Sequence, residues 1–279
     1  MSTMPSTAAL RQGAVPAPRQ PRRIPRPALG NFRRFLSPLA LVALWQAGSM
    51  LGLIPARTLA APAAILASAW DLTASGALPY NLLVSLQRVL LGLGLGISVG
   101  GGLAIIAGLS KRGEDLVDAP MQMLRTLPFL ALVPLFILWF GIGELPKIGL
   151  VAFGSAFPIY ITLFAGIRGA DPKLVEAGRI SGLDRRGTIR HVILPAALPS
   201  ALVGLRYALG TAWLSLVVAE QINATAGIGY LINDARDFLR TDIIIVGLLV
   251  YALLGLVADA LVRWIERRAL AWRPALVRS

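Results

Sequence analysis

The chain has 279 residues, of which 56% are hydrophobic and only 15% are charged, and its mean hydropathy is +0.70. A composition this apolar excludes an ordinary soluble domain and predicts a polytopic membrane protein. Cysteine is absent and His191 is the single histidine, which excludes disulfides, thiol chemistry and metal sites built from cysteine or clustered histidines.

The N-terminal segment is rich in proline, arginine and alanine and contains no apolar run. A secretory signal peptide needs such a run, so we interpret residues 1–34 as a disordered basic tail in the cytoplasm. Residues 267–279 are predicted to form a second basic cytoplasmic tail. Specific contact of the first tail with lipid or nucleic acid is the alternative to a simple solvated arm.

The remaining chain contains apolar runs close to the roughly 20 residues that a bilayer core requires. They lie at residues 36–54, 89–109, 126–143, 148–167, 200–219 and 243–262. These runs predict an all-α helical bundle with about six transmembrane helices.

Residues 35–80 are predicted to hold the first of these helices and a short helix on the outer membrane surface. The uncharged residues 58–70 are too few to span the bilayer, and Pro62 suits a first helical position. Residues 81–266 are predicted to form the main transmembrane domain.

The distribution of positive charge predicts the orientation of the bundle. With six spans, only four of the 27 lysines and arginines would face the outside, namely Arg57, Lys147, Arg236 and Arg240. Because cytoplasmic loops carry the excess of positive charge, both termini and the loop at residues 171–199 are predicted to be cytoplasmic.

Small residues and prolines mark two of the predicted spans. Gly92, Gly96 and Gly100 recur at every fourth residue and predict a stripe for close helix packing, or alternatively a surface for sliding between states. Pro120, Pro128 and Pro134 interrupt the next apolar region, which should therefore face protein or a water-filled path.

The loop at residues 171–199 has the pattern of two short helices. Asp171 is a helix cap followed by a proline, and the helix is expected to run to Ser181. Gly182 predicts a left-handed turn, Asp184 a second cap, and Pro195 the end of the second helix. Leu174, Ala177, Gly178 and Ser181 share one face of the first helix, which suits insertion into the groove of a partner.

These residues resemble a known family. Glu176-Ala177-Gly178, then Gly182, and Val192-Ile193-Leu194-Pro195 after nine further residues are similar to the cytoplasmic signature loop of permease subunits of ATP-binding-cassette (ABC) importers. The departure is Gly178, where the family prefers alanine.

The resemblance covers roughly residues 80–270. The stretches LVSLQRVLLGLGLGISVGG, RTLPFLALVPLFILWFGIGELPKI and AWLSLVVAEQINATAGIGYLINDAR look like the subgroup of these permeases that imports aliphatic sulfonates, taurine and nitrate.

The resemblance implies the transmembrane domain of a type I ABC importer in the bacterial inner membrane. Its expected partners are a second copy of the chain, two cytoplasmic ATPases and a periplasmic or lipid-anchored binding protein. The loop at residues 171–195 is then the site of ATPase coupling, with these expected functional residues: Glu176, Ala177, Gly178, Gly182, Val192, Leu194 and Pro195.

The chain contains no Gly-x-x-x-x-Gly-Lys-Ser/Thr phosphate loop, so no enzymatic activity and no cofactor are predicted for this subunit. ATP and Mg²⁺ are expected on the partner ATPase.

The candidate residues for the translocation path are aromatic, hydroxylated or acidic: Trp139, Thr211, Trp213, Ser215 and Glu220. Glu220 is expected to pair with Arg236 or Arg240, and Asp259 with Arg263.

The sequence thus predicts transport of a small anionic solute, foremost an aliphatic sulfonate, by alternating access. Taurine, nitrate or another small compound is the alternative cargo. An ATP-independent channel or membrane scaffold is the alternative of another class.

Overall fold

The computed structural model describes residues 29–272, and it divides the chain into two units, residues 1–44 and 45–279. The described residues form helices joined by short connections, and no strand occurs among them. The predicted tail residues 1–28 and 273–279 lie outside the described residues. Helix α1 (Leu29–Met50) begins inside the segment predicted as a tail, and α11 (Thr241–Ala269) continues three residues into the second one.

Most of α1 belongs to the first unit, and Leu36, Leu39 and Leu41 are exposed on it. Such a surface suits contact with lipid tails.

The second unit begins with α2 (Pro62–Ala74), in which Pro62 occupies the first turn as predicted. It is followed by the long helix α3 (Ala77–Leu109). Helix α3 starts 12 residues before the apolar run predicted at residues 89–109, because the polar residues before that run are tolerated in the buried core described below.

The predicted span at residues 126–143 is interrupted. Helix α4 (Lys111–Leu124) precedes the break, and only the 12 residues of α5 (Phe129–Phe140) follow it. The break falls at Pro128, which stands before α5 in extended conformation, whereas Pro120 and Pro134 lie inside helices. A proline disfavours helical geometry in the residue before it, so the chain turns between Arg125 and Pro128.

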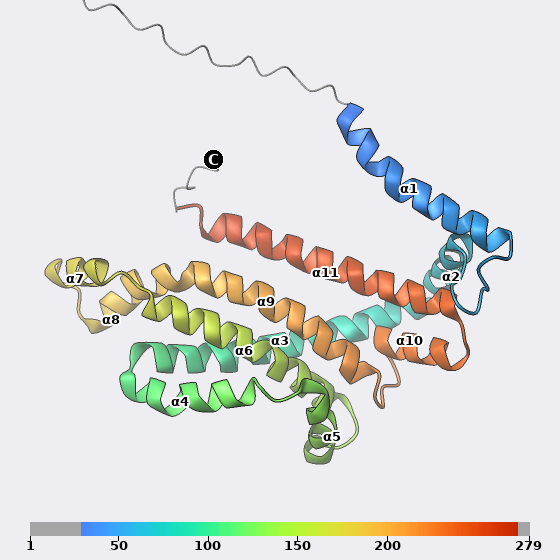
Figure 1. Cartoon of the computed structure of the whole chain (residues 1–279). Helices are drawn as coiled ribbons and strands as arrows, with labels where there is room; N and C mark the ends of the chain where they lie inside the picture. Colours follow the sequence, from blue (N-terminus) through green and yellow to red (C-terminus); the bar gives the residue numbers. More distant parts are fainter. Residues whose placement is uncertain (1–28, 273–279) are drawn as a thin grey trace, which may run out of the picture. The chain divides into compact units, whose positions relative to one another are not determined.

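The rest of the unit consists of α6 (Glu144–Arg168), α7 (Pro172–Ile180), α8 (Arg185–Thr188), a π-helical turn η1 (Ile189–Ile193), α9 (Leu194–Glu220), α10 (Ile228–Asp237) and α11. Helices α7 and α8 lie at one end of this unit and α10 at the other (Figure 1). Four helical segments among the described residues are long and apolar enough to cross a membrane: α3, α6, the continuous segment at residues 185–220, and α11.

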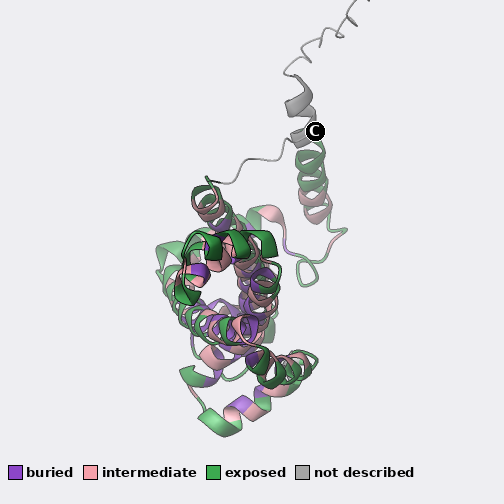
Figure 2. Ribbon diagram, turned by 90° about the vertical axis from the view of Figure 1, so that its left-hand side faces the viewer, coloured by how far each residue is buried: buried purple, intermediate pink, exposed green. Residues whose placement is uncertain are grey.

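The core of the second unit lies between α3, α6 and α9. Val89, Val151 and Leu216 come from these three helices and belong to one buried apolar cluster. The buried positions lie where helices face one another, whereas the outward surfaces are exposed (Figure 2). Exposed leucines on α11, including Leu248, Leu253 and Leu256, are typical of a surface that faces lipid.

Candidate functional site

The predicted glycine stripe lies where α3 meets α6. Gly92, Gly96 and Gly100 are buried, and a methyl group added at Gly100 would lie 2.9 Å from the carbonyl carbon of Ala156. At Gly92 an added methyl group would lie 2.6 Å from Cβ of Val151. A side chain does not fit at such distances, so these glycines allow the two helices to approach closely.

A cluster of charged side chains lies near the start of α6 and the end of α9; Arg88 and Glu220 are buried in it, and Glu144 is exposed. Arg88 of α3 is 2% exposed, and Glu220, the last residue of α9, is 1% exposed. Nη1 of Arg88 donates to Glu220 at 2.7 Å, while Nε and Nη2 donate to the two carboxylate oxygens of Glu144 at 2.6 and 2.7 Å. Arg88 therefore ties α3 to both α6 and α9 by charge-assisted hydrogen bonds.

The carboxylate of Glu220 accepts hydrogen bonds from three further groups. The hydroxyl of Ser85 donates to its carboxylate at 2.8 Å, and the hydroxyl of Tyr251 on α11 donates at 3.1 Å. The backbone N–H of Gly229 on α10 donates at 2.8 Å. Because a buried carboxylate is tolerated only when its oxygens are paired, these bonds make five helices depend on one another.

The connection between α9 and α10 is held by the same cluster. Nη1 of Arg88 donates to the carbonyl of Ala226 at 2.7 Å, and the side-chain oxygen of Asn81 accepts from the N–H of Gly227 at 2.7 Å. We call Asn81, Ser85, Arg88, Glu144, Glu220 and Tyr251 the charge network.

The predicted partners of Glu220 were wrong. Arg236 and Arg240 instead lie near the acidic residues Asp237 and Asp242. Arg88 could have indicated the true partner of Glu220, because it is a cation that precedes a long apolar run and needs a carboxylate from another helix. The predicted pair of Asp259 with Arg263 is confirmed, and Arg206 of α9 also contacts Asp259.

The loop after α6 has the predicted capping geometry. The carboxylate of Asp171 accepts from the N–H of Lys173 at 2.9 Å at the start of α7. Gly182 has φ +84°, which favours glycine, and the carboxylate of Asp184 accepts from the N–H of Gly187 at 2.7 Å at the start of α8.

The face of α7 differs from the prediction at one position. Gly178 is buried, and a methyl group added to it would lie 3.3 Å from Cγ2 of Val192. Glu176 and Ala177 are exposed, and Ile180 is 82% exposed. Gly178 therefore packs α7 against η1, and a partner would meet the opposite face of the helix.

The second helix of the loop does not stop at Pro195. The π-helical turn η1 joins α8 to α9 without interruption, and the N–H of Leu194 donates to the carbonyl of Ile189. The wide turn shifts the carbonyls away from the proline ring, so Pro195 occupies the first turn of α9 instead of ending a helix. Residues 185–220 are consequently one continuous helical segment.

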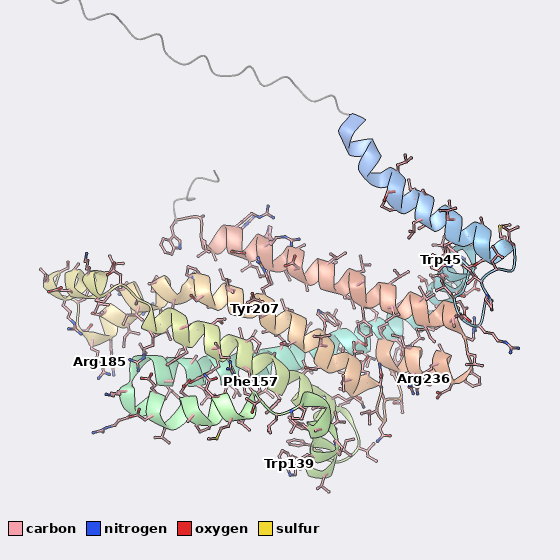
Figure 3. All side chains as sticks on the ribbon, in the orientation of Figure 1. Trp45, Trp139, Phe157, Arg185, Tyr207 and Arg236 are labelled. Atoms are coloured by element: carbon pink, nitrogen blue, oxygen red, sulfur yellow. The ribbon has the colours of Figure 1, made fainter. Side chains whose placement is uncertain are left out.

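The five candidate path residues are not gathered in one place. Thr211 and Ser215 line a cavity of about 460 Å³ between α6, α9 and the break after α4. Trp213 packs against Tyr251 with ring centroids 6.4 Å apart, and Trp139 is 62% exposed on α5 (Figure 3). Glu220 is enclosed in the charge network. Only Thr211 and Ser215 thus share a cavity.

The cavity is also lined by residues other than the five candidates. Arg125 and Leu127 come from the break between α4 and α5, and Phe153 and Phe157 come from α6. Within residues 29–272 no group of three acidic or histidine side chains is placed to hold a metal ion.

Comparison with known proteins decides the family. Residues 92–270 match the family described as "Binding-protein-dependent transport system inner membrane component". The chain belongs to this family. It is therefore a permease component of an ABC importer in the inner membrane, and the resemblance drawn from residues 176–195 is confirmed.

Relatives of this permease support the predicted subgroup. It is 50% identical to the protein named aliphatic sulfonates transport permease SsuC of Escherichia coli (strain K12), over 85% of this chain and 90% of the relative. It is 45% identical to the protein of the same name from Bacillus subtilis (strain 168), over 89% and 90%. Identity to the taurine transport system permease TauC of Escherichia coli (strain K12) is 35%, over 69% and 70%.

Solved structures support the predicted fold of the permease. The crystal structure of an amino acid ABC transporter with histidines matches with a TM-score of 0.58 at 20% identity, over 67% of this chain and 92% of that one. The MetNI methionine ABC transporter matches with a TM-score of 0.55 at 18% identity, over 66% and 94%. The expected all-α type I importer fold is confirmed.

Proposed function

We propose that this permease translocates aliphatic sulfonates in an ATP-driven importer. The observation that carries the proposal is the 50% identity over 85% of the chain to a protein named for aliphatic sulfonates transport. The weaker likeness to a taurine permease makes taurine, which is itself a sulfonate, the second candidate cargo.

The working assembly that we propose contains two copies of the permease, two cytoplasmic ATPases and a periplasmic or lipid-anchored binding protein. The family description calls the transport system binding-protein-dependent, which supports the binding protein. The sequence contains no phosphate-binding loop, which supports ATP and Mg²⁺ binding on the ATPases, with no cofactor and no catalysis in this subunit.

We propose that both ends of the chain and the loop that holds α7 and α8 lie in the cytoplasm. The six lysines and arginines from Arg168 to Arg190 support this orientation, because positive charge gathers on the cytoplasmic side. The charge network would then lie toward the outer side, at the far ends of α6 and α9.

The coupling function is proposed for Glu176, Ala177, Gly178, Gly182, Val192, Leu194 and Pro195. The exposed face of α7 offers apolar area at Ala177 and Ile180 and a carboxylate at Glu176 to a groove of the ATPase. Gly178 and Val192 fix α7 against η1, and the uninterrupted helix from 185 to 220 ends at Glu220 in the charge network. A displacement of α7 by the closing ATPases would therefore reach the outer end directly and drive alternating access.

The test is reconstitution of the complete complex in liposomes with its binding protein and labelled ethanesulfonate. We expect ATP-dependent uptake by the unchanged complex. Glu176→Lys should reduce both copurification of the ATPase and uptake, because it reverses a charge on the exposed face of α7.

Asp71→Lys is the matched control, since Asp71 is an exposed carboxylate on α2, distant in sequence from the loop. It should leave uptake unchanged. Normal copurification and uptake by Glu176→Lys would contradict the coupling role, and absence of ethanesulfonate uptake by the unchanged complex would contradict the proposed cargo.

A further inference from the structure

We propose that Arg125 binds the anionic head of the substrate in the cavity between α6 and α9, and that the apolar wall of this cavity holds the tail. The proposal rests on the function proposed above and names the part of the path that recognises the cargo. Four observations carry it: the depth of the cavity, the lack of an ion-pair partner for Arg125, a serine hydroxyl available in the wall, and the apolar composition of the rest of the wall.

The cavity lies at the depth of the membrane interior. Phe157, which lines it, is near the middle of α6, one of the helices long enough to span the bilayer (Figure 3). Arg125 enters the cavity from the break between α4 and α5. Non-helical backbone at membrane depth is tolerated where it lines a cavity, and interrupted helices supply substrate sites in other transporters.

Arg125 is a cation without a protein partner. It is exposed to the cavity, and no carboxylate of the described residues forms an ion pair with it. A charge at membrane depth is costly unless it is paired or hydrated, and it marks a functional site by default. None of the described residues around the cavity is acidic, so the missing negative charge has to come from a ligand.

Ser215 supplies a second polar group. Its side chain is buried, with 4% of the residue exposed, and it lines the cavity, yet its hydroxyl takes part in no hydrogen bond among the described residues. The neighbouring hydroxyl of Thr211 already donates to backbone carbonyls, so Ser215 is the hydroxyl that can donate to an anion. The Ser215 hydroxyl is therefore available to donate a hydrogen bond to an oxygen of an anion in the cavity.

The rest of the wall suits a short apolar tail. Phe153, Phe157 and Leu214 line the cavity, whose volume of about 460 Å³ lies in the range of small-molecule sites. A sulfonate presents three oxygens to the guanidinium and hydroxyl donors, while its carbon chain contacts these side chains. The absence of a carboxylate among the residues described there favours a sulfonate without an amino group, because a buried ammonium would stay unpaired.

The test uses the full complex in liposomes at saturating binding protein loaded with ethanesulfonate, so that the uptake rate reports on the permease. Arg125→Gln should reduce maximal uptake about ten-fold or more, the loss expected for a charged hydrogen-bond partner. ATP hydrolysis stimulated by the loaded binding protein should persist. Arg125→Lys should recover part of the uptake because it keeps the charge.

Arg112→Gln is the matched control, since Arg112 is an exposed arginine in α4 and does not line the cavity. It should transport at the unchanged rate. Ser215→Ala should lower uptake by a smaller factor than Arg125→Gln.

Unchanged uptake in Arg125→Gln, or equal losses in Arg125→Gln and Arg112→Gln, would overturn the proposal. Loss of stimulated ATP hydrolysis together with uptake, with no recovery in Arg125→Lys, would show a structural role and would also overturn it. Failure of the unchanged complex to import ethanesulfonate would instead refute the proposed cargo, so the two failures are distinct.

Discussion

The two ends of the second unit are built in opposite ways. At the end that holds α10, Arg88 and Glu220 are buried and bonded to each other in a network that joins five helices. At the end that holds α7 and α8, the charged side chains are exposed, and Gly178 is the only buried residue of α7. The first end suits a fixed junction, whereas the second end presents a surface to a partner.

Two arginines show the same difference at the level of one side chain. Arg88 donates four hydrogen bonds to protein oxygens, and its charge is neutralised by two carboxylates. Arg125 faces a cavity and has no ion-pair partner among the described residues. Pairing, more than the presence of charge at membrane depth, therefore separates a residue that maintains the fold from one available to a ligand.

Removal of one partner from the charge network should have the largest effect on stability. Glu220→Ala leaves Arg88 buried with one carboxylate lost, and breaking a buried pair in this way costs about 3–5 kcal/mol. We expect a strongly reduced unfolding temperature of the purified permease in detergent, measured by a thermal shift assay.

The control for this variant is Glu266→Ala, which removes the exposed partner of Arg206 at 2.7 Å. Exposed pairs contribute about 0–1 kcal/mol, so this change should be small. Equal effects of the two variants would contradict the idea that the buried pair stabilises the permease more than the exposed pair does.

A substitution in the glycine stripe should have an intermediate effect. Gly100→Ala places a methyl group 2.9 Å from backbone carbon of Ala156, and overpacking of this kind costs about 1–3 kcal/mol. Gly94→Ala on the same helix meets nothing within 4 Å and should be neutral or slightly stabilising. The same thermal shift assay checks both, and an unchanged unfolding temperature for Gly100→Ala would mean that α3 and α6 can separate slightly at little cost.

The smallest effect is expected in the loop. Gly178→Ala restores the residue that the signature pattern prefers and raises helix propensity by about 1 kcal/mol at most, while its methyl group presses on Val192 at 3.3 Å. Because a valine side chain can shift by a few tenths of an ångström, we expect a change of less than about 1 kcal/mol and normal uptake.

Gly182→Ala provides the contrast in the same loop, since φ is +84° there and alanine is strained, at a cost of about 1 kcal/mol. If Gly178→Ala proved more damaging than Gly182→Ala, the contact between α7 and η1 would be tighter than the geometry indicates.

Local structure could be predicted from the sequence because it depends on neighbouring residues. Asp171, Gly182 and Asp184 adopt the caps and turn that their side chains predict, and the four-residue spacing of glycines marks the seam against α6. The apolar runs identified the membrane helices, although the break at Pro128 shortened one of them.

The tertiary structure alone decided which charges meet. The partner of Glu220 lies 132 residues away at Arg88, and it was missed because nearer arginines were available in the sequence. Likewise, Arg125 and Ser215 come to one cavity only when α4, α6 and α9 have packed. Periodicity and capping act over a few residues, whereas the pairing of buried charges depends on which helices share a core. Local patterns in a single sequence do not show which helices these are.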